Sequence, residues 1–181
     1  MNILFASSEA VPFAVSGGLA EVAGALPKAL KAKGEDVRVI LPLYGSVTEE
    51  QRAEMKYLLN FDVAVAWRRQ YCGVFEAKAD GVTYYLLDNE YYFKRSGLYG
   101  YYDDAERFAF FSRAVLDTVK HLEELDGFKP DIIHCNDWQT ALVPIYLLED
   151  KYRFPHLANA KSVFTIHNIE YQGRYGEQVL E

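Results

Sequence analysis

Two kinds of hydrophobic pattern alternate along the 181-residue chain. Short apolar runs without alternation are typical of strands buried on both faces, whereas apolar residues every three or four positions are typical of helices. The runs predict strands at 2–6, 36–41, 131–135 and 161–166, and the helical spacing predicts helices at 18–33, at 105–125 and up to about residue 148. Strands that alternate with helices favour an α/β fold with a mostly parallel, Rossmann-like sheet and flanking helices.

The pattern changes between residues 55 and 87. Three strand-like runs follow one another there without a helix, separated by polar turns that contain glycine. Such a series predicts a small antiparallel insertion on the parallel sheet. The next stretch, 88–104, is rich in tyrosine and is expected to be a long loop. Long loops in compact domains usually bind a ligand or are covered by another domain, although a plain exposed connection is the alternative.

Charge and composition limit the classes of binding partner that the chain can have. The formal net charge of −7 argues against nucleic acid or an anionic membrane as the main partner, because both require a basic face. No apolar run reaches the length of a membrane span. Cys72 and Cys135 have no metal-ligand spacing, and we expect a reducing, cytoplasmic compartment. No histidine pair has ligand spacing either: we expect His134 in the core and His121 and His156 at the surface. No metal and no cofactor is predicted.

A glycine pair opens the first long helix. Gly17 and Gly18 follow the first strand and a loop of about ten residues. Two glycines let the backbone approach a ligand, and a helix start offers unpaired N–H groups and the positive end of the helix dipole. This turn is a candidate seat for a phosphate group. An isolated glycine pair more often serves only a tight turn and close packing. Evidence from the rest of the chain is therefore needed to choose between a phosphate site and a purely structural turn.

Three polar side chains follow predicted strands at the same edge of the sheet. Glu9, Asp137 and His167 lie just beyond the carboxyl ends of their strands, where functional residues of open α/β sheets gather. His167 is the best single candidate for chemistry, although a lone histidine is usually structural. Asp137 and Trp138 could be a helix cap and a buried anchor. A carboxylate beside an indole also suits a sugar, which offers hydroxyls and an apolar ring face.

Together these motifs resemble one family. The chain contains SGGLAEV at 16–22, GALPKAL at 24–30, DVRV at 36–39, AERF at 105–108, HCNDW at 134–138 and FTIHNIEYQG at 164–173. In this order they resemble bacterial glycogen synthases and plant starch synthases. The resemblance runs through nearly the whole chain, which is more specific than any single motif.

The resemblance implies that residues 1–181 form the amino-terminal Rossmann-like domain, one half of a GT-B glycosyltransferase whose carboxy-terminal nucleotide-binding domain is absent. Such enzymes transfer glucose from ADP-glucose to the non-reducing end of an α-1,4-glucan with retention of configuration, in a cleft between the two domains. The chain alone is therefore expected to be inactive. The implied partners are ADP-glucose, the α-1,4-glucan acceptor and the missing domain.

The resemblance also implies roles for single residues. It assigns the diphosphate to Gly17 and Gly18, nearby ligand contacts to Glu21, and the glucosyl site to Asp137, His167 and Asn168, with His167 and Asp137 as the catalytic candidates. Glu9, Trp138, Tyr99 and Val15 complete the predicted substrate-binding set.

One position departs from the family. Val15 stands where the family often has a lysine that reaches the phosphates, so phosphate binding by this loop alone should be weaker. This keeps open a GT-B transferase with another donor or acceptor, and a glucan-binding module without catalysis is a further alternative. A dehydrogenase is a distant third, because Gly17-Gly18-Leu19 does not match Gly-x-Gly.

Overall fold

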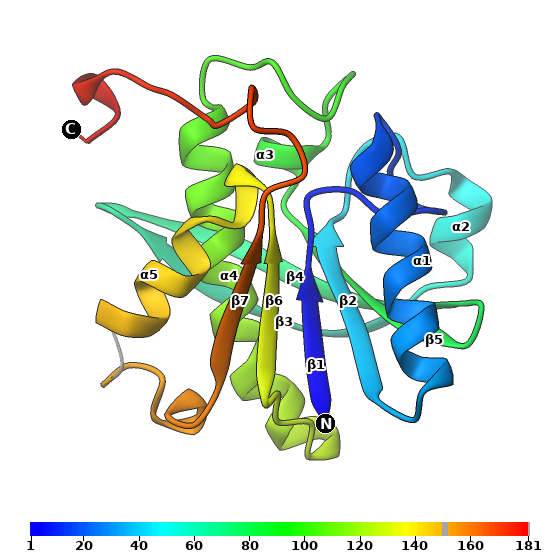
Figure 1. Ribbon diagram of the computed structural model, residues 1–181. Coiled ribbons are helices and arrows are strands. Elements are labelled where there is room, and N and C mark those ends of the chain that lie inside the picture. Colours follow the sequence, from blue (N-terminus) through cyan, green and yellow to red (C-terminus); the bar gives the residue numbers. More distant parts are fainter. Residues whose placement is uncertain (150–151, 181) are drawn as a thin grey trace.

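The computed structural model describes residues 1–149 and 152–180 and contains a seven-stranded sheet in the order β3-β4-β5-β2-β1-β6-β7 (Figure 1). The strands are β1 (Asn2–Ala6), β2 (Asp36–Pro42), β3 (Lys56–Val65), β4 (Arg68–Ala79), β5 (Val82–Asp88), β6 (Ile132–Asn136) and β7 (Lys161–Thr165). The helices are α1 (Gly18–Ala32), α2 (Glu49–Ala53), α3 (Glu90–Phe93), α4 (Asp104–Asp126) and α5 (Leu142–Glu149), with 3-10 turns η1 (Trp138–Thr140), η2 (Pro155–Leu157) and η3 (Glu177–Leu180).

The centre of the sheet is parallel. β1 pairs with β2 and β6, β2 pairs with β5, and β6 pairs with β7, all in parallel register. Leu4, Phe5 and Ala6 of β1 have no exposed surface, as the unbroken apolar run requires of a strand covered on both faces. The Rossmann-like, mostly parallel fold predicted from the sequence is confirmed. Its parallel strands all end at one edge, the upper edge in Figure 1.

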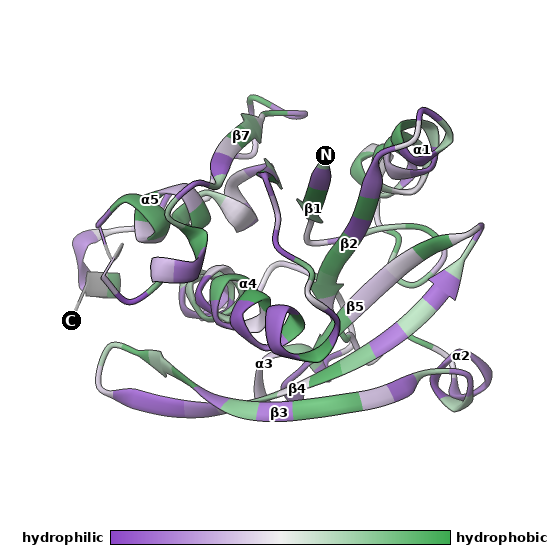
Figure 2. Ribbon diagram, turned by 90° about the horizontal axis from the view of Figure 1, so that it is seen from below, coloured by the Kyte–Doolittle hydropathy of each residue, from purple (hydrophilic) through white to green (hydrophobic). Residues whose placement is uncertain are grey.

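Helices cover both faces of this sheet. α1 packs against β2 and β5, while α4 packs against β3 and β2 on the other side. Figure 2 shows α1 and α4 on opposite sides of β1 and β2, with β3 and β4 passing beneath α4. The stripe of α4 is buried along its length, including Phe108, Phe111, Val115 and Leu122. This stripe of α4 therefore belongs to the hydrophobic core that it shares with the sheet.

The antiparallel insertion is also confirmed. β3 pairs with β4, and β4 pairs with β5, both antiparallel. β5 then joins the parallel part through β2. The three-stranded meander thus extends the sheet and gives α4 a second surface to pack on (Figure 2).

The stretch 88–104 is more ordered than the sequence suggested. It contains the short helix α3, whose first turn is capped because the Asn89 side chain accepts a hydrogen bond from Tyr92 N at 3.0 Å. Tyr92 and Phe93 have no exposed surface, and both rings pack against Phe110 of α4. Part of the aromatic content of this stretch therefore fills the core, and the expectation of one irregular loop was wrong.

Within the described ranges, no helix combines the length and apolar character needed to cross a bilayer.

Candidate functional site

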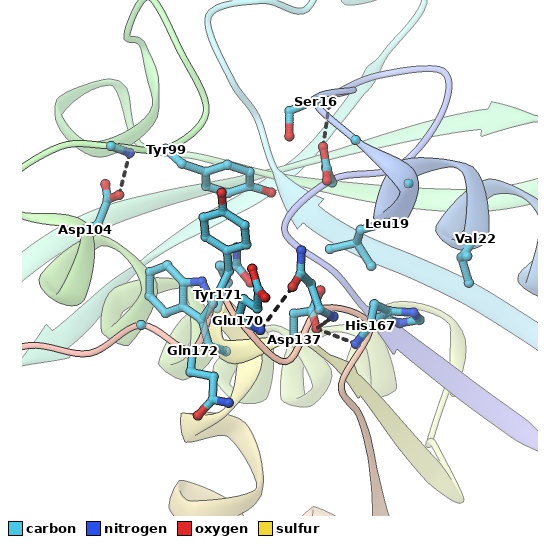
Figure 3. Close-up of a pocket in the computed structure, with 18 of the residues that line it drawn as sticks. Ser16, Leu19, Val22, Tyr99, Asp104, Asp137, His167, Glu170, Tyr171 and Gln172 are labelled. Carbon is cyan, nitrogen blue, oxygen red and sulfur yellow. Dashed lines mark hydrogen bonds between the residues drawn. The ribbon is translucent and has the colours of Figure 1, made fainter.

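A cavity of about 1000 Å³ opens at the carboxyl edge of the parallel strands. It lies between the start of α1, the loop before α4, η1 and the segment that follows β7 (Figure 3). Of the ten predicted site residues, eight line it: Glu9, Gly17, Gly18, Tyr99, Asp137, Trp138, His167 and Asn168. Residues from distant parts of the sequence thus meet in one space because parallel strands end at one edge.

The glycine turn faces this cavity with its backbone. Gly17 is extended and forms the start of α1, which has no side-chain cap. A side-chain carbon added at Gly18 would meet no atom within 4 Å, so the space beside it belongs to the cavity. The buried carboxylate of Glu9 accepts a hydrogen bond from Ser16 N at 2.5 Å. Glu9 therefore holds the turn from behind, and the first amides of α1 remain available to an anion.

Asp137 joins two strand ends. It follows β6 with a positive φ of 56°, a conformation that aspartate tolerates better than most residues. Its Oδ1 accepts hydrogen bonds from His167 N at 2.7 Å and from Asn168 N at 3.4 Å. It makes no cap hydrogen bond to η1, so the helix-cap interpretation does not hold. Asp137 instead fixes the backbone of the segment that carries His167 (Figure 3).

The ring of His167 is anchored through a residue that the sequence reasoning missed. Its Nε2 lies 2.9 Å from Oδ1 of Asn136, the last residue of β6. Asn136 is fully buried, and its Nδ2 donates to the carbonyl oxygens of Ala6 and His134. One feature of the sequence could have pointed to Asn136: it stands directly before Asp137 at the end of a buried strand. A polar side chain buried there needs a hydrogen-bond partner.

The Trp138 indole is held in the cavity wall by the rings and the backbone around it. Its ring centroid lies 5.1 Å from that of Phe108 and 5.8 Å from that of Tyr175. Gly173 has a φ of 58°, and a side-chain carbon there would overlap the indole. Part of the indole surface is therefore occupied by the chain itself, which limits how much of it a sugar can contact.

Tyr99 and Asp104 complete the wall beside α4, and Ser8 supports Tyr99 from outside the lining. The Tyr99 hydroxyl lies 2.7 Å from Ser8 Oγ, and burial together with the nearby Glu9 raises the Tyr99 pKa above its ordinary value. Asp104 accepts a hydrogen bond from Gly100 N at 2.7 Å and also lines the cavity. The sequence reasoning did not select Ser8 or Asp104.

Two predicted residues lie outside the cavity wall. Val15 and Glu21 are exposed and are absent from the lining, because Val15 precedes the turn and Glu21 follows it by one helical turn. The lining carries four acidic side chains and, as its basic residue within the described ranges, Arg174. An anion here would depend on the α1 amides, with few cations nearby.

The remaining histidines and the two cysteines are absent from the cavity lining. His134 is half-buried beside Phe5, and burial, with a smaller contribution from His167, lowers its pKa. His156 is not the surface residue expected, because it is half-buried and its pKa is also lowered. Cys72 and Cys135 are buried free thiols. Across residues 1–149 and 152–180, no three His, Cys, Asp or Glu side chains are grouped to hold a metal ion.

The chain is similar in sequence to known glycogen synthases. The chain is 53% identical to a glycogen synthase of Clostridium novyi over 99% of its length and 37% of that protein. It is 53% identical to a glycogen synthase of Geobacillus stearothermophilus over 100% of its length and 36% of that protein. The chain thus spans little more than a third of these relatives.

A solved structure and a family model extend the comparison. The catalytic domain of starch synthase IV from Arabidopsis thaliana, bound to ADP and acarbose, superposes with a TM-score of 0.82 at 34% identity, covering 95% of this chain and 35% of that one. The family model of the starch synthase catalytic domain matches residues 2–181. The chain therefore belongs to the starch synthase catalytic domain family.

Proposed function

We propose that this chain supplies one face of the active site of a cytoplasmic glycogen synthase, which transfers glucose from ADP-glucose to the non-reducing end of an α-1,4-glucan with retention. The observation that carries the proposal is the meeting of the glycine turn with Asp137 and His167 in one cavity of about 1000 Å³. Cavities of this size accommodate a ligand larger than a single sugar.

The donor diphosphate would bind at the start of α1. The uncapped helix start provides backbone donors and the positive end of a dipole beside Gly17 and Gly18. Because the wall is acidic overall, we expect the second domain of the enzyme to provide most of the positive charge. The Clostridium novyi relative is long enough for such a domain, since the chain matches only 37% of it.

The glucosyl group would lie against Asp137, His167 and Asn168. One oxygen of the Asp137 carboxylate is occupied by the two backbone amides, so the other is the better candidate for a sugar contact. A polar side chain held rigidly beside the reacting carbon stabilises the positive charge that develops there in the transition state. His167 is fixed through both its backbone and its ring, and it fits this role.

The acceptor glucan would extend along the aromatic side of the cavity. Tyr99, Trp138 and Tyr171 line this side, and flat rings suit the apolar faces of sugar rings. Starch synthase IV in the solved structure is bound to ADP and acarbose. That pair of ligands agrees with a nucleotide and a sugar bound in this fold, and it supports the proposal by analogy.

The test places this chain in a complete enzyme. The matched third of the Clostridium novyi relative is replaced by residues 1–181, and incorporation of labelled glucose into glycogen is measured from ADP-glucose. We expect the chimera to be active and the isolated chain to be inactive. In the chimera, His167→Gln should lower kcat on the order of a hundredfold. His121→Gln, the same exchange against Phe61 and away from the cavity, should leave kcat unchanged. Equal activity of these two variants would contradict the assignment.

Val15 favours one alternative, a related transferase with a different donor. A set of sugar nucleotides offered to the chimera distinguishes the two, because preference for a donor other than ADP-glucose would replace the proposal. If ADP-glucose is the donor, Val15→Lys should tighten ADP binding by about tenfold or more, since a charge-assisted contact is typically worth about 1.5 to 3 kcal/mol.

A further inference from the structure

The structure joins the buried Asn136 to the cavity residue His167 through a single hydrogen bond. Asn136 Oδ1 lies 2.9 Å from His167 Nε2, and the histidine itself lines the cavity. A neutral imidazole carries its proton on one of two nitrogens, and which nitrogen it is decides whether the ring donates or accepts at each side.

The orientation of the Asn136 amide follows from its other partners. Two backbone carbonyl oxygens, those of Ala6 and His134, lie 3.0 and 3.2 Å from Nδ2. Carbonyl oxygens only accept hydrogen bonds, so the NH₂ group must face them and uses both its protons on them. The opposite orientation would set an oxygen against two oxygens in a site with no exposed surface. The acceptor atom of Asn136 therefore faces His167.

We propose that Asn136 is a positioning residue that holds neutral His167 in the tautomer with the proton on Nε2. The remaining nitrogen, Nδ1, then carries the lone pair, and none of the residues that the structure describes donates a hydrogen bond to it. A ring in this state accepts a hydrogen bond from a hydroxyl group and is a poor partner for a phosphate oxygen, which also only accepts. If the proposed function is right, His167 recognises a sugar hydroxyl, and the phosphates are left to the α1 amides.

The position of the His167 proton depends on backbone groups of the sheet. The carbonyl groups of β1 and β6 fix the Asn136 amide, the amide fixes the His167 proton, and the proton decides which ligand group the ring can bind. Asp137 adds a second restraint, because it holds the His167 backbone N–H. Asn136 itself is absent from the cavity lining, so it acts on a ligand only through His167.

The test reads the tautomer directly in the 181-residue chain, without ligand. Long-range proton–nitrogen NMR spectra of ¹⁵N-labelled protein distinguish a protonated ring nitrogen from an unprotonated one, and His167→Gln identifies the signals. At a pH where imidazoles are neutral, the proton should reside on Nε2 of His167. The minor tautomer should be depleted on the order of tenfold relative to the urea-unfolded chain, the bias expected from about one well-made hydrogen bond.

Two variants separate this effect from a general disturbance of the fold. Asn136→Leu should return the His167 tautomer ratio to that of the unfolded chain while His134 keeps its own signature. Thr165→Val removes the hydroxyl that lies 2.8 Å from His134 Nε2, and it should change His134 but not His167. A wild-type chain with the His167 proton on Nδ1, or with the same ratio as the unfolded chain, would overturn the proposal without any variant. A correct tautomer in a chain whose chimera is inactive would instead refute the proposed function alone.

Discussion

Arg107 has no exposed surface, although it carries a full positive charge. Its Nε donates to the carbonyl oxygen of Tyr92 at 2.7 Å, and its Nη1 donates to the carbonyl oxygen of Leu98 at 3.0 Å and to Asp104 Oδ1 at 2.5 Å. Asp104 in turn holds Gly100 N. The guanidinium thus ties the stretch that carries Tyr99 to the first turn of α4, and the cavity wall depends on it.

We expect Arg107→Met to be among the most destabilising single changes in the chain. Methionine keeps much of the apolar stem but removes three charge-assisted hydrogen bonds. The carboxylate of Asp104, whose side chain is 7% exposed, would then be buried without a cation. Removing one partner of a buried ion pair typically costs about 3 to 5 kcal/mol, because the remaining charge keeps its desolvation penalty. Domains of this kind are stable by about 5 to 15 kcal/mol, so the variant should lie near its unfolding threshold.

Urea unfolding of the 181-residue chain measures this loss as a lower midpoint at an unchanged slope. Arg95→Met is the matched control. Arg95 also holds an aspartate, Asp103, through two contacts of 2.6 Å, and also reaches a backbone carbonyl, but its side chain is 20% exposed. Its loss should cost at most about 1 kcal/mol, since water can replace the lost contacts.

A third variant tests the reason for the difference. Arg107→Met combined with Asp104→Asn removes both charges, so most of the loss should be recovered if an unpaired buried carboxylate is its cause. Equal losses for Arg107→Met and Arg95→Met, or a double variant less stable than Arg107→Met alone, would refute the reasoning.

Changes at three other positions test the site and its pH dependence. Gly173→Ala should displace the Trp138 indole and shift its fluorescence in a Trp67→Phe background; an unchanged spectrum would show that the ring does not depend on this glycine. Asp137→Asn should preserve the amide signals of residues 167 and 168 because it keeps an acceptor oxygen, whereas Asp137→Ala should broaden or shift them; identical spectra would contradict the anchoring role. Burial lowers the pKa of His134, so the unfolded chain binds its proton more readily and stability should fall as the pH drops below about 6.5. His134→Gln should make urea midpoints less dependent on pH in that range, and an unaltered slope would count against it.

Much of the architecture was predictable because local patterns determine it. The unbroken apolar run of β1 and the helical stripe of α4 each correspond to an element whose bounds differ from the prediction by at most a residue or so. The antiparallel meander followed from strand patterns without helices between them. The cavity edge also followed, since parallel strands must end on one side.

The stretch 88–104 shows where this reasoning failed. Its tyrosines predicted one long loop that binds a ligand or is covered by another domain, yet Tyr92 lies in the core and Tyr102 is almost fully exposed. Sequence alone cannot separate the two, because the difference depends on whether Phe110 of α4 lies within reach of the ring. Contacts between residues far apart in the chain decide this.

The sequence by itself determined the parallel strands, the long helices and which polar residues stand at strand ends, since these depend on residue type and spacing along the chain. Only the tertiary structure decided which groups those polar residues contact and which residues face the cavity. It turned Asp137 from a candidate helix cap into an anchor for the His167 backbone, left Val15 outside the cavity and brought Asn136 against the histidine ring. Hydrogen bonds across 30 residues or more depend on atomic positions that only the packed sheet defines.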